Sequence, residues 1–322
     1  MSSGSAGRVT RSAVVPECET APRTRAGALL RTADGVAIDA VYEPGAAVYG
    51  SAPVFVVAHG FTGDLDKPHV RRVARALSRY GAVVTFSFRG HGRSGGRSTV
   101  GDREVLDLAA AVSWARGLGH ERVVTVGFSM GGSVVLRHAA LHGPRRAGAT
   151  GTAGTAPAEG VHRDDAHAED AHGEKAHSDD AHRDDAHAAE TDAHTDAVVS
   201  VSAPARWYYR GTAPMRRLHW LVMRPEGRLL SRYGLRTRIH HRDWDPVPLS
   251  PVEAVPRIAP TPLLIVHGDR DGYFPLDHPR MLAEAAGDHG ELWLEAGMGH
   301  AENAAADELL DRIGRWALAR AG

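Results

Sequence analysis

The sequence predicts a doubly wound, mostly parallel α/β sheet, and three observations support this fold class. Short runs of apolar residues recur along the chain, as expected for strands that are buried on both faces. Between these runs, apolar residues fall at helical spacing. Because strands that alternate with helices pair in parallel through right-handed crossovers, this alternation indicates helices on both faces of one sheet. The chain has 322 residues, 43% of them hydrophobic, which is enough for one large domain with additions.

The first part of the predicted core, residues 26–149, contains the clearest alternation of strands and helices. A hairpin is expected over residues 29–42, because two short runs flank the turn sequence Ala33-Asp34-Gly35. The strands predicted after the hairpin cover residues 54–58, 82–86 and 123–126. The predicted helices cover residues 69–80, residues 102–116, and the segment that ends at His142.

The alternation stops in a low-complexity insert rich in histidine and acidic residues, residues 150–196, which has almost no large apolar side chain. Its histidines recur every five residues at His162, His167, His172, His177, His182 and His187, and His194 follows after a slip. A period of five matches neither a helix nor a strand, so no single apolar face can form. We therefore expect this insert to be disordered, and we expect the same of the polar N-terminal tail, residues 1–25.

Order is expected to resume after the insert with a core strand at residues 197–202. Residues 203–257 combine aromatic residues and methionines with eleven arginines against four acids, and they predict a small helical lid with loops. The last part of the core covers residues 258–322. Its predicted elements are strands at 263–266 and 292–294, a helix that includes 281–286, and a closing helix at 304–319.

Ser129 is the candidate nucleophile, because it occupies the centre of the sequence Gly127-Phe128-Ser129-Met130-Gly131. This Gly-x-Ser-x-Gly motif follows a predicted strand and precedes a predicted helix, which is the context of a nucleophile elbow. The two glycines leave room for a tight, strained turn that lifts the serine hydroxyl clear of the sheet. The motif alone is weak evidence, and the flanking strand and helix make it strong.

The chain also offers an acid and a base for this serine. A serine hydroxyl is nearly inert at neutral pH, so it needs a base within hydrogen-bond reach and an acid that orients the base. In parallel sheets such groups gather at the carboxyl ends of strands. The loop after the penultimate predicted strand contains Asp269 and Asp271, with Asp277 further on, and the loop after the last strand contains His300.

Several short segments together suggest a family. They are His59-Gly60-Phe61-Thr62-Gly63, Arg89-Gly90-His91-Gly92-Arg93-Ser94, the elbow around Ser129, Gly268-Asp269-Arg270-Asp271, and Gly299-His300. With these segments the chain resembles the α/β-hydrolase superfamily, most closely its esterase, lipase and serine-aminopeptidase-like branch. The resemblance covers residues 29–319, apart from the insert and, weakly, the lid. It implies that Asp271 orients the imidazole and that His300 is the base, in the chain order serine, acid, histidine.

Acyl transfer also needs hydrogen-bond donors for the negative charge that develops on the carbonyl oxygen. The backbone N–H of Met130, the residue after the nucleophile, is one expected donor of this oxyanion hole. The loop after the strand at 54–58 supplies the other, which we assign to the Phe61 N–H. The Met130 and Phe61 side chains are expected to border the pocket. His59, beside this loop, is expected to hold the loop by hydrogen bonds rather than to act as a base.

Composition argues against several classes of protein. The net charge of −1 hides an acidic insert and a mildly basic remainder, and this spread-out excess does not indicate nucleic-acid binding. Cys18 is the single cysteine, so an intramolecular disulfide is excluded. The N-terminus has no apolar signal-peptide region, and no apolar run is long enough to cross a bilayer. We therefore expect a cytoplasmic protein without an integral membrane segment.

The expected function is a serine hydrolase that cleaves a small-molecule carboxylic ester, or a thioester or amide, through an acyl-enzyme on Ser129. This chemistry requires no cofactor and no metal ion. A serine at this position argues against the dehalogenase and epoxide-hydrolase members of the fold, which attack with a carboxylate. Acyltransferase and cofactor-free peroxidase chemistry would use the same triad and stay open, as does a catalytically silent receptor.

The lid and the insert each leave two interpretations open. The lid aromatic residues and methionines could form the wall of an apolar pocket for an acyl or aromatic group, or a small separate core. The insert histidines could bind zinc, nickel or copper and make this a metal-binding or metal-buffering protein. The alternative is a solvated linker without fixed ligand geometry. The sequence does not specify the oligomeric state.

Overall fold

The computed structural model describes residues 24–46, 52–143 and 192–321, and these residues form one eight-stranded sheet. The strands are β1 (Ala26–Arg31), β2 (Ala37–Glu43), β3 (Val54–Ala58), β4 (Ala82–Phe86), β5 (Val123–Phe128), β6 (Ala197–Val201), β7 (Leu263–Gly268) and β8 (Gly290–Glu295). Their order in the sheet is β1-β2-β4-β3-β5-β6-β7-β8. Strand β2 runs antiparallel to β1 and β4, and the other pairs are parallel. The predicted fold class, mostly parallel and doubly wound, is confirmed.

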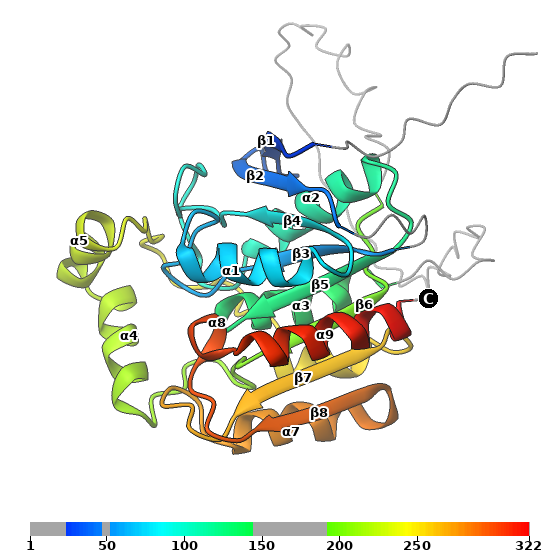
Figure 1. Ribbon diagram of the computed structural model, residues 1–322. Coiled ribbons are helices and arrows are strands. Elements are labelled where there is room, and N and C mark those ends of the chain that lie inside the picture. The colour runs from blue at the N-terminus through cyan, green and yellow to red at the C-terminus, as the bar shows by residue number, and fades with distance from the viewer. Residues whose placement is uncertain (1–23, 47–51, 144–191, 322) are drawn as a thin grey trace, which may run out of the picture.

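Helices cover both faces of this sheet (Figure 1). Helices α1 (Pro68–Leu77) and α9 (Asp307–Arg320) lie on one face, together with the short α8 (Ala301–Ala304). The other face is covered by α2 (Glu104–Gly117), α3 (Met130–Leu141) and α7 (Asp277–Ala286), which is followed by the 3₁₀ turn η2 (Gly287–His289). Each face therefore has its own hydrophobic core.

Alternate residues of the parallel strands enter these two cores. In β3, Val54 and Val56 pack under α2 and α3, whereas Phe55 and Val57 pack under α1 and α9. All residues of β3 are buried. Because both faces of the sheet are covered, the strands are apolar throughout instead of alternating with polar residues. This is why the runs at 54–58 and 82–86 predicted the bounds of β3 and β4 correctly.

The closing helix differs from its prediction, because the chain breaks into α8 and α9 where one helix at 304–319 was expected. The backbone of Ala305 and Ala306 is extended, with ψ angles of 110° and 160°. This break lets α8 follow directly after His300, so that the loop carrying His300 and the long helix α9 take different directions. The apolar residues of α9, including Leu310 and Ile313, are buried against the sheet.

A buried arginine ties the predicted hairpin, now β1 and β2, to the rest of the core. The Arg89 side chain is 3% exposed and donates hydrogen bonds to Asp34 in the hairpin turn (2.7 Å) and to Asp107 on α2 (2.9 Å). Removing one partner of such a buried pair is strongly destabilising, because the other charge loses its compensation. The pair therefore anchors the glycine-rich loop after β4, which brings His91 close to the loop after β3.

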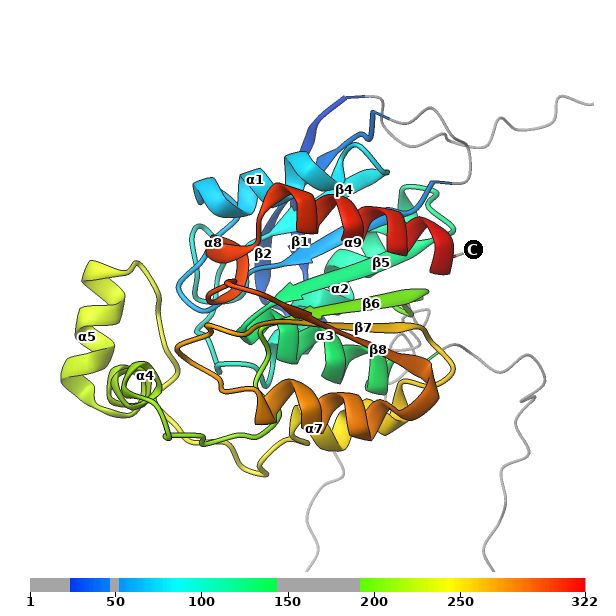
Figure 2. The same ribbon diagram turned by 60° about the horizontal axis from the view of Figure 1, so that its bottom comes forward.

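Helices α4 (Ala213–Met223) and α5 (Pro225–Gly234) stand outside both layers, beyond the carboxyl ends of the parallel strands (Figures 1 and 2). The predicted lid, residues 203–257, extends too far, because α6 (Pro251–Ala254) and the 3₁₀ helix η1 (Val255–Arg257) pack against α3 and α7. Ala254 and Val255 have no exposed surface, so they belong to the core. We call residues 203–250 the helical segment.

Most of the predicted tail and most of the predicted insert lie outside the described residues, and the predictions for those parts stay untested. Only the last residues of the insert, 192–196, are described, and they differ from the expected disorder. The Thr195 hydroxyl donates to the Val123 carbonyl (3.1 Å), and Asp196 accepts from Arg116 (2.7 Å). These contacts start the return of the chain into β6. Across the described ranges, we find no helix with the length and apolarity that crossing a membrane requires.

Candidate active site

Ser129 lies in the sharp turn between β5 and α3, with a φ angle of 53°. The glycines on either side are required by close backbone contacts. A Cβ on Gly127 would lie 2.2 Å from the carbonyl oxygen of Gly131, and a Cβ on Gly131 would lie 2.2 Å from that of Ala58. The Ser129 N–H donates to the Val201 carbonyl (2.8 Å), which ties the turn to β6. The local sequence therefore holds a strained residue in place by packing on both sides.

The structure brings the three predicted residues of the triad together. The His300 Nε2 lies 2.9 Å from the Ser129 Oγ, and the His300 Nδ1 lies 2.7 Å from an Asp271 carboxylate oxygen. A carboxylate only accepts hydrogen bonds, so the Nδ1 carries the proton and the Nε2 lone pair faces the serine hydroxyl. This is the arrangement in which an imidazole can accept the serine proton.

Asp271 is held as a buried carboxylate. Its side chain has no exposed surface, and its second oxygen accepts from the backbone N–H groups of Tyr273 (2.8 Å) and Phe274 (3.1 Å). Burial by itself raises the pKa of Asp271. The hydrogen bond and charge of His300, followed by the two backbone N–H groups, outweigh burial and hold the pKa below its usual value. Asp271 is therefore ionised at neutral pH.

The two other carboxylates considered from the sequence have different partners. Asp269 accepts from the Gly297 N–H (2.6 Å), which fastens the loop after β7 to the loop that carries His300. Asp277, on the first turn of α7, forms an ion pair with Arg206 (2.8 Å). Of these three acids, Asp271 is the one that contacts His300.

Sequence reasoning missed several residues that hold the His300 ring. Tyr273 stacks on the imidazole, with ring centroids 4.2 Å apart and an angle of 25° between the planes. The buried His267 Nε2–H donates to the Phe274 carbonyl (2.8 Å) and so supports the loop of Asp271. The Ser202 hydroxyl accepts from the Ala301 N–H (3.1 Å). The available signal was their place in the sequence: Tyr273 lies two residues after Asp271, His267 lies in β7, and Ser202 directly follows β6.

Within residues 60–63 of the loop after β3, one backbone N–H has no protein acceptor among the described residues. The Gly60 N–H donates to Glu302 (3.1 Å), the Thr62 N–H to His91 (3.3 Å), and the Gly63 N–H to the Gly60 carbonyl (3.0 Å). The N–H without an acceptor is that of Phe61. Glu302, which is almost fully buried, was also missed from the sequence; it lies on α8 immediately after the catalytic-histidine candidate.

His59 holds this loop, as its position predicts, and it does not contact Ser129 or Asp271. Its Nδ1–H donates to the Gly60 carbonyl (2.7 Å), and its Nε2 accepts from the Phe88 N–H (3.0 Å). Burial lowers the pKa of His59 to about 3, with the neighbouring His91 adding to the shift. The imidazole is therefore neutral, and both nitrogens are committed to the backbone.

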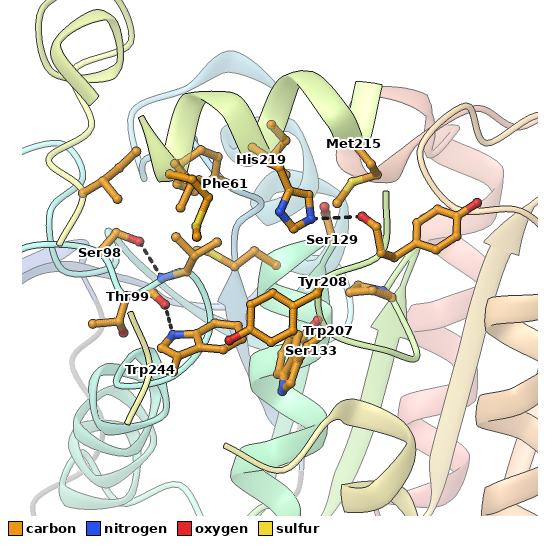
Figure 3. A pocket seen from close by; sticks show the side chains of 18 of the residues that line it. Phe61, Ser98, Thr99, Ser129, Ser133, Trp207, Tyr208, Met215, His219 and Trp244 are labelled. Carbon is orange, nitrogen blue, oxygen red and sulfur yellow. Dashed lines mark hydrogen bonds between the residues drawn. The ribbon is translucent and has the colours of Figure 1, made fainter. Parts of the chain in front are cut away.

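Two pockets open beside Ser129 beneath α4. The first, which we call the aromatic pocket, carries Trp207, Tyr208, Trp244, Met215 and His219 on its walls (Figure 3). The second, which we call the histidine-side pocket, is lined by residues that include His300, Glu302, Tyr273, Leu218 and Trp220. The Phe61 and Met130 side chains border the aromatic pocket. Of the lid aromatic residues, Trp207, Tyr208 and Trp244 line this pocket, and their role as the wall of an acyl site stays a prediction.

Metal binding has no support within the described ranges, where no group of three or more histidine, cysteine, aspartate or glutamate side chains is placed to hold an ion. The insert histidines from His162 to His187 lie outside those ranges, so the metal-binding hypothesis for the insert stays a prediction.

Known proteins give the same assignment of fold. The Pyrococcus furiosus esterase has a structure with a TM-score of 0.61 and 20% sequence identity, covering 92% of this chain and 93% of that chain. A Xanthomonas campestris α/β serine hydrolase without lid gives 0.54 and 18%, covering 94% and 96%. A Haemophilus influenzae protein named "Putative esterase/lipase" is 31% identical over 91 residues, which span 28% of this chain and only 30% of that protein. The family model for the alpha/beta hydrolase fold matches residues 53–302, most of the chain, and the protein therefore belongs to the α/β-hydrolase family.

Proposed function

We propose that the protein is a serine esterase that hydrolyses a small-molecule carboxylic ester through an acyl-enzyme on Ser129. The observation that carries this proposal is the row of Ser129, His300 and Asp271, joined by contacts of 2.9 Å and 2.7 Å. Esterase and hydrolase names among the similar proteins agree with it. A cytoplasmic location and a mechanism without cofactor or metal ion are part of the same proposal.

In the first half of the reaction, His300 accepts the Ser129 proton as the serine oxygen attacks the ester carbonyl carbon. The carbon–oxygen bond to the alcohol then breaks, and the proton on the His300 Nε2 passes to the departing alcohol oxygen. In the second half, a water molecule gives a proton to His300 and attacks the acyl carbon. The bond between that carbon and the Ser129 oxygen breaks, the proton on His300 returns to the Ser129 oxygen, and the carboxylic acid leaves. Asp271 keeps the imidazole in the required tautomer and stabilises its positive charge.

The backbone N–H groups of Met130 and Phe61 are the proposed oxyanion donors. The Phe61 amide has no protein acceptor among the described residues, while its neighbours Gly60, Thr62 and Gly63 donate elsewhere. We infer that Glu302 orients this loop, because it accepts from Gly60 immediately before Phe61. A single donor of this kind is worth about 3 kcal/mol of transition-state stabilisation.

The decisive experiment compares the wild type with Ser129→Ala. We expect the variant to lose at least about 10⁴-fold in kcat on 4-methylumbelliferyl acetate. Labelling by a fluorophosphonate reagent should disappear with it, because only an activated serine attacks such a reagent. The melting temperature serves as the control and should not fall. Ester hydrolysis that survives in Ser129→Ala would refute the proposal.

A further inference from the structure

The two pockets differ in their relation to His300, and this difference assigns each of them to one half of the ester. His300 delivers its proton to the leaving alcohol, so the alcohol must lie on the imidazole side of Ser129. The histidine-side pocket is lined by His300 and by the residues that follow it. The aromatic pocket shares Ser129 and Phe61 with it but is not bordered by His300. The acyl group therefore extends into the aromatic pocket. This assignment rests on the proposed esterase function.

Three rings form one wall of the aromatic pocket. The ring centroids of Trp207 and Trp244 are 5.0 Å apart, and those of Tyr208 and Trp244 are 5.5 Å apart. Both indole N–H groups are used elsewhere: Trp207 donates to the Pro248 carbonyl (2.9 Å) and Trp244 to the Thr99 carbonyl (2.7 Å). The indoles are thus fixed in place and cannot donate to a substrate. What they present is the surface of aromatic rings, which favours stacking with another ring.

The same pocket contains two polar atoms without a protein partner in the described parts of the chain. Ser133, one turn after Ser129 on α3, is 1% exposed, and its hydroxyl makes no hydrogen bond. His219 projects from α4 into the pocket (Figure 3). Its Nε2–H donates to the Tyr209 carbonyl (3.0 Å), which leaves the Nδ1 as an unpaired acceptor. Burial, together with the charge of Arg210, lowers the pKa of His219, so the ring is neutral at pH 7.

Unpaired polar atoms in an apolar pocket select their ligands. A buried donor or acceptor without a partner is costly, and a ligand group that satisfies it removes that cost. The buried Ser133 hydroxyl carries this cost. His219 is half-buried, and its Nδ1 can accept a hydrogen bond from a donor that enters the pocket. A phenolic hydroxyl supplies a donor at the edge of a ring that the indoles can stack on.

We propose that the aromatic pocket is the acyl-binding site, and that it selects aryl acyl groups that carry a phenolic hydroxyl. Trp207, Tyr208 and Trp244 recognise the ring, and His219 and Ser133 recognise the hydroxyl. The substrates are thus esters of hydroxyaryl-substituted carboxylic acids, with the alcohol in the histidine-side pocket.

The ring preference is tested with 4-methylumbelliferyl esters that share one leaving group. Phenylacetate and 3-phenylpropanoate are compared with their cyclohexyl counterparts, which are of similar size and more hydrophobic. We expect kcat/KM to be about tenfold higher for the aryl member of the better pair, because only the aryl group stacks. Trp244→Leu should bring this ratio, measured within the variant, close to one. The matched control Trp220→Leu, at an exposed position of α4 outside the aromatic pocket, should preserve it.

The hydroxyl preference is tested with 3-(3-hydroxyphenyl)- and 3-(4-hydroxyphenyl)propanoate against 3-phenylpropanoate. We expect at least one hydroxylated ester to react about fivefold faster or more, in kcat/KM. This ratio should fall towards one in His219→Phe, which keeps a ring but has no acceptor, and should also decrease in Ser133→Ala. Ratios are measured within each variant, so a change in stability does not affect them.

The outcomes separate this inference from the proposed function. Acetate hydrolysis that depends on Ser129, without an aryl or hydroxyl preference at either chain length, would overturn the inference and leave the esterase function standing. If no ester is hydrolysed, binding of 3-(4-hydroxyphenyl)propanamide and 3-cyclohexylpropanamide to the wild type is measured by quenching of tryptophan fluorescence. Tighter binding of the aryl amide, lost in Trp244→Leu, supports the inference even then, and equal binding overturns it.

Discussion

The carboxyl edge of the sheet and the helical segment above it are built in opposite ways. At the edge, Ser129 sits between glycines that tolerate no side chain, and the Asp271 side chain has no exposed surface. In the helical segment, Met215 is the buried hydrophobic residue of α4, whereas Leu229 and Tyr233 of α5 are 57% and 74% exposed. Both regions border the same pockets, but α4 and α5 contribute no residue to either hydrophobic core.

This contrast indicates how positioning and selectivity are divided. The serine, the imidazole and the carboxylate must keep their geometry closely, and backbone contacts on several sides hold them. The helical segment is attached at a few places: Thr212 donates to the Tyr273 carbonyl (2.9 Å), Trp244 donates to the Thr99 carbonyl (2.7 Å), and residues 238–240 pair with the backbone of the loop after β4. A weakly packed segment can change its side chains without disturbing the core, which suits it to determine the substrate.

The largest expected effect tests the edge. In Gly131→Ala, the new Cβ would lie 2.2 Å from the Ala58 carbonyl oxygen, so the end of β3 or the elbow must move. We expect the free energy of unfolding to fall by about 3 kcal/mol. Activity on 4-methylumbelliferyl acetate should fall by about 100-fold or more, because the Ser129 hydroxyl no longer aligns with the Phe61 N–H in the loop after β3. Urea unfolding and initial rates measure the two effects.

The matched control for that change is Gly117→Ala at the end of α2, where no atom lies within 4 Å of the new Cβ. Its free energy of unfolding should stay within about 1 kcal/mol of the wild type, and its activity should be unchanged. Equal effects at the two glycines would contradict the view that close packing fixes the elbow.

A smaller effect is expected on the free energy of unfolding at acidic pH. Burial lowers the pKa of His59 to about 3 and that of His91 to about 4, so both are neutral in the folded protein at pH 5.5. In the unfolded chain, histidine titrates near pH 6.5, and below that pH the unfolded chain binds more protons. Stability is therefore complete above pH ~6.5 and decreases as the pH falls towards the folded-state values. At pH 5.5 the expected loss is about 1 kcal/mol per histidine.

Urea unfolding at pH 7.5 and pH 5.5 measures this acid sensitivity. In His91→Gln the loss between the two values should be about 1 kcal/mol smaller than in the wild type, because glutamine gains no proton. Loss of the contact with the Thr62 N–H would lower the free energy of unfolding of the variant equally at pH 7.5 and at pH 5.5. The test therefore uses the difference between the free energies at the two pH values. An unchanged difference would show that His91 does not contribute.

The smallest expected effect tests the helical segment. Leu229→Ala, on the exposed side of α5, should change the free energy of unfolding by less than about 0.5 kcal/mol. The same substitution at Leu136, fully buried in α3, should cost about 2–5 kcal/mol. Both are measured by urea unfolding, with acetate hydrolysis as a check that Leu229→Ala keeps the active geometry. A cost at Leu229 comparable to that at Leu136 would mean that α5 is part of the cooperative core.

Much of the edge could be predicted because its signals are local. The strand, the two glycines and the helix around Ser129 are consecutive in the chain, and a tight turn at that point requires glycine on both sides. The strands were found because burial on both faces makes them apolar without interruption. The helical segment was less predictable: its end at residue 257 was placed too late, because the apolar residues Ala254 and Val255 pack on distant helices.

By itself, the sequence determined the sheet, the elbow at Ser129 and the position of His300 after the last strand, because each depends on neighbours within a few residues. The family resemblance implied Asp271, but the physical reason why it faces His300 and Asp269 does not lies in the tertiary structure. The two acids share one loop, and the backbone N–H groups of Tyr273, Phe274 and Gly297 set their directions. Only the tertiary structure decided the pocket that Trp207 and Trp244 share, because contacts between residues so far apart in the chain arise from packing and leave no local pattern.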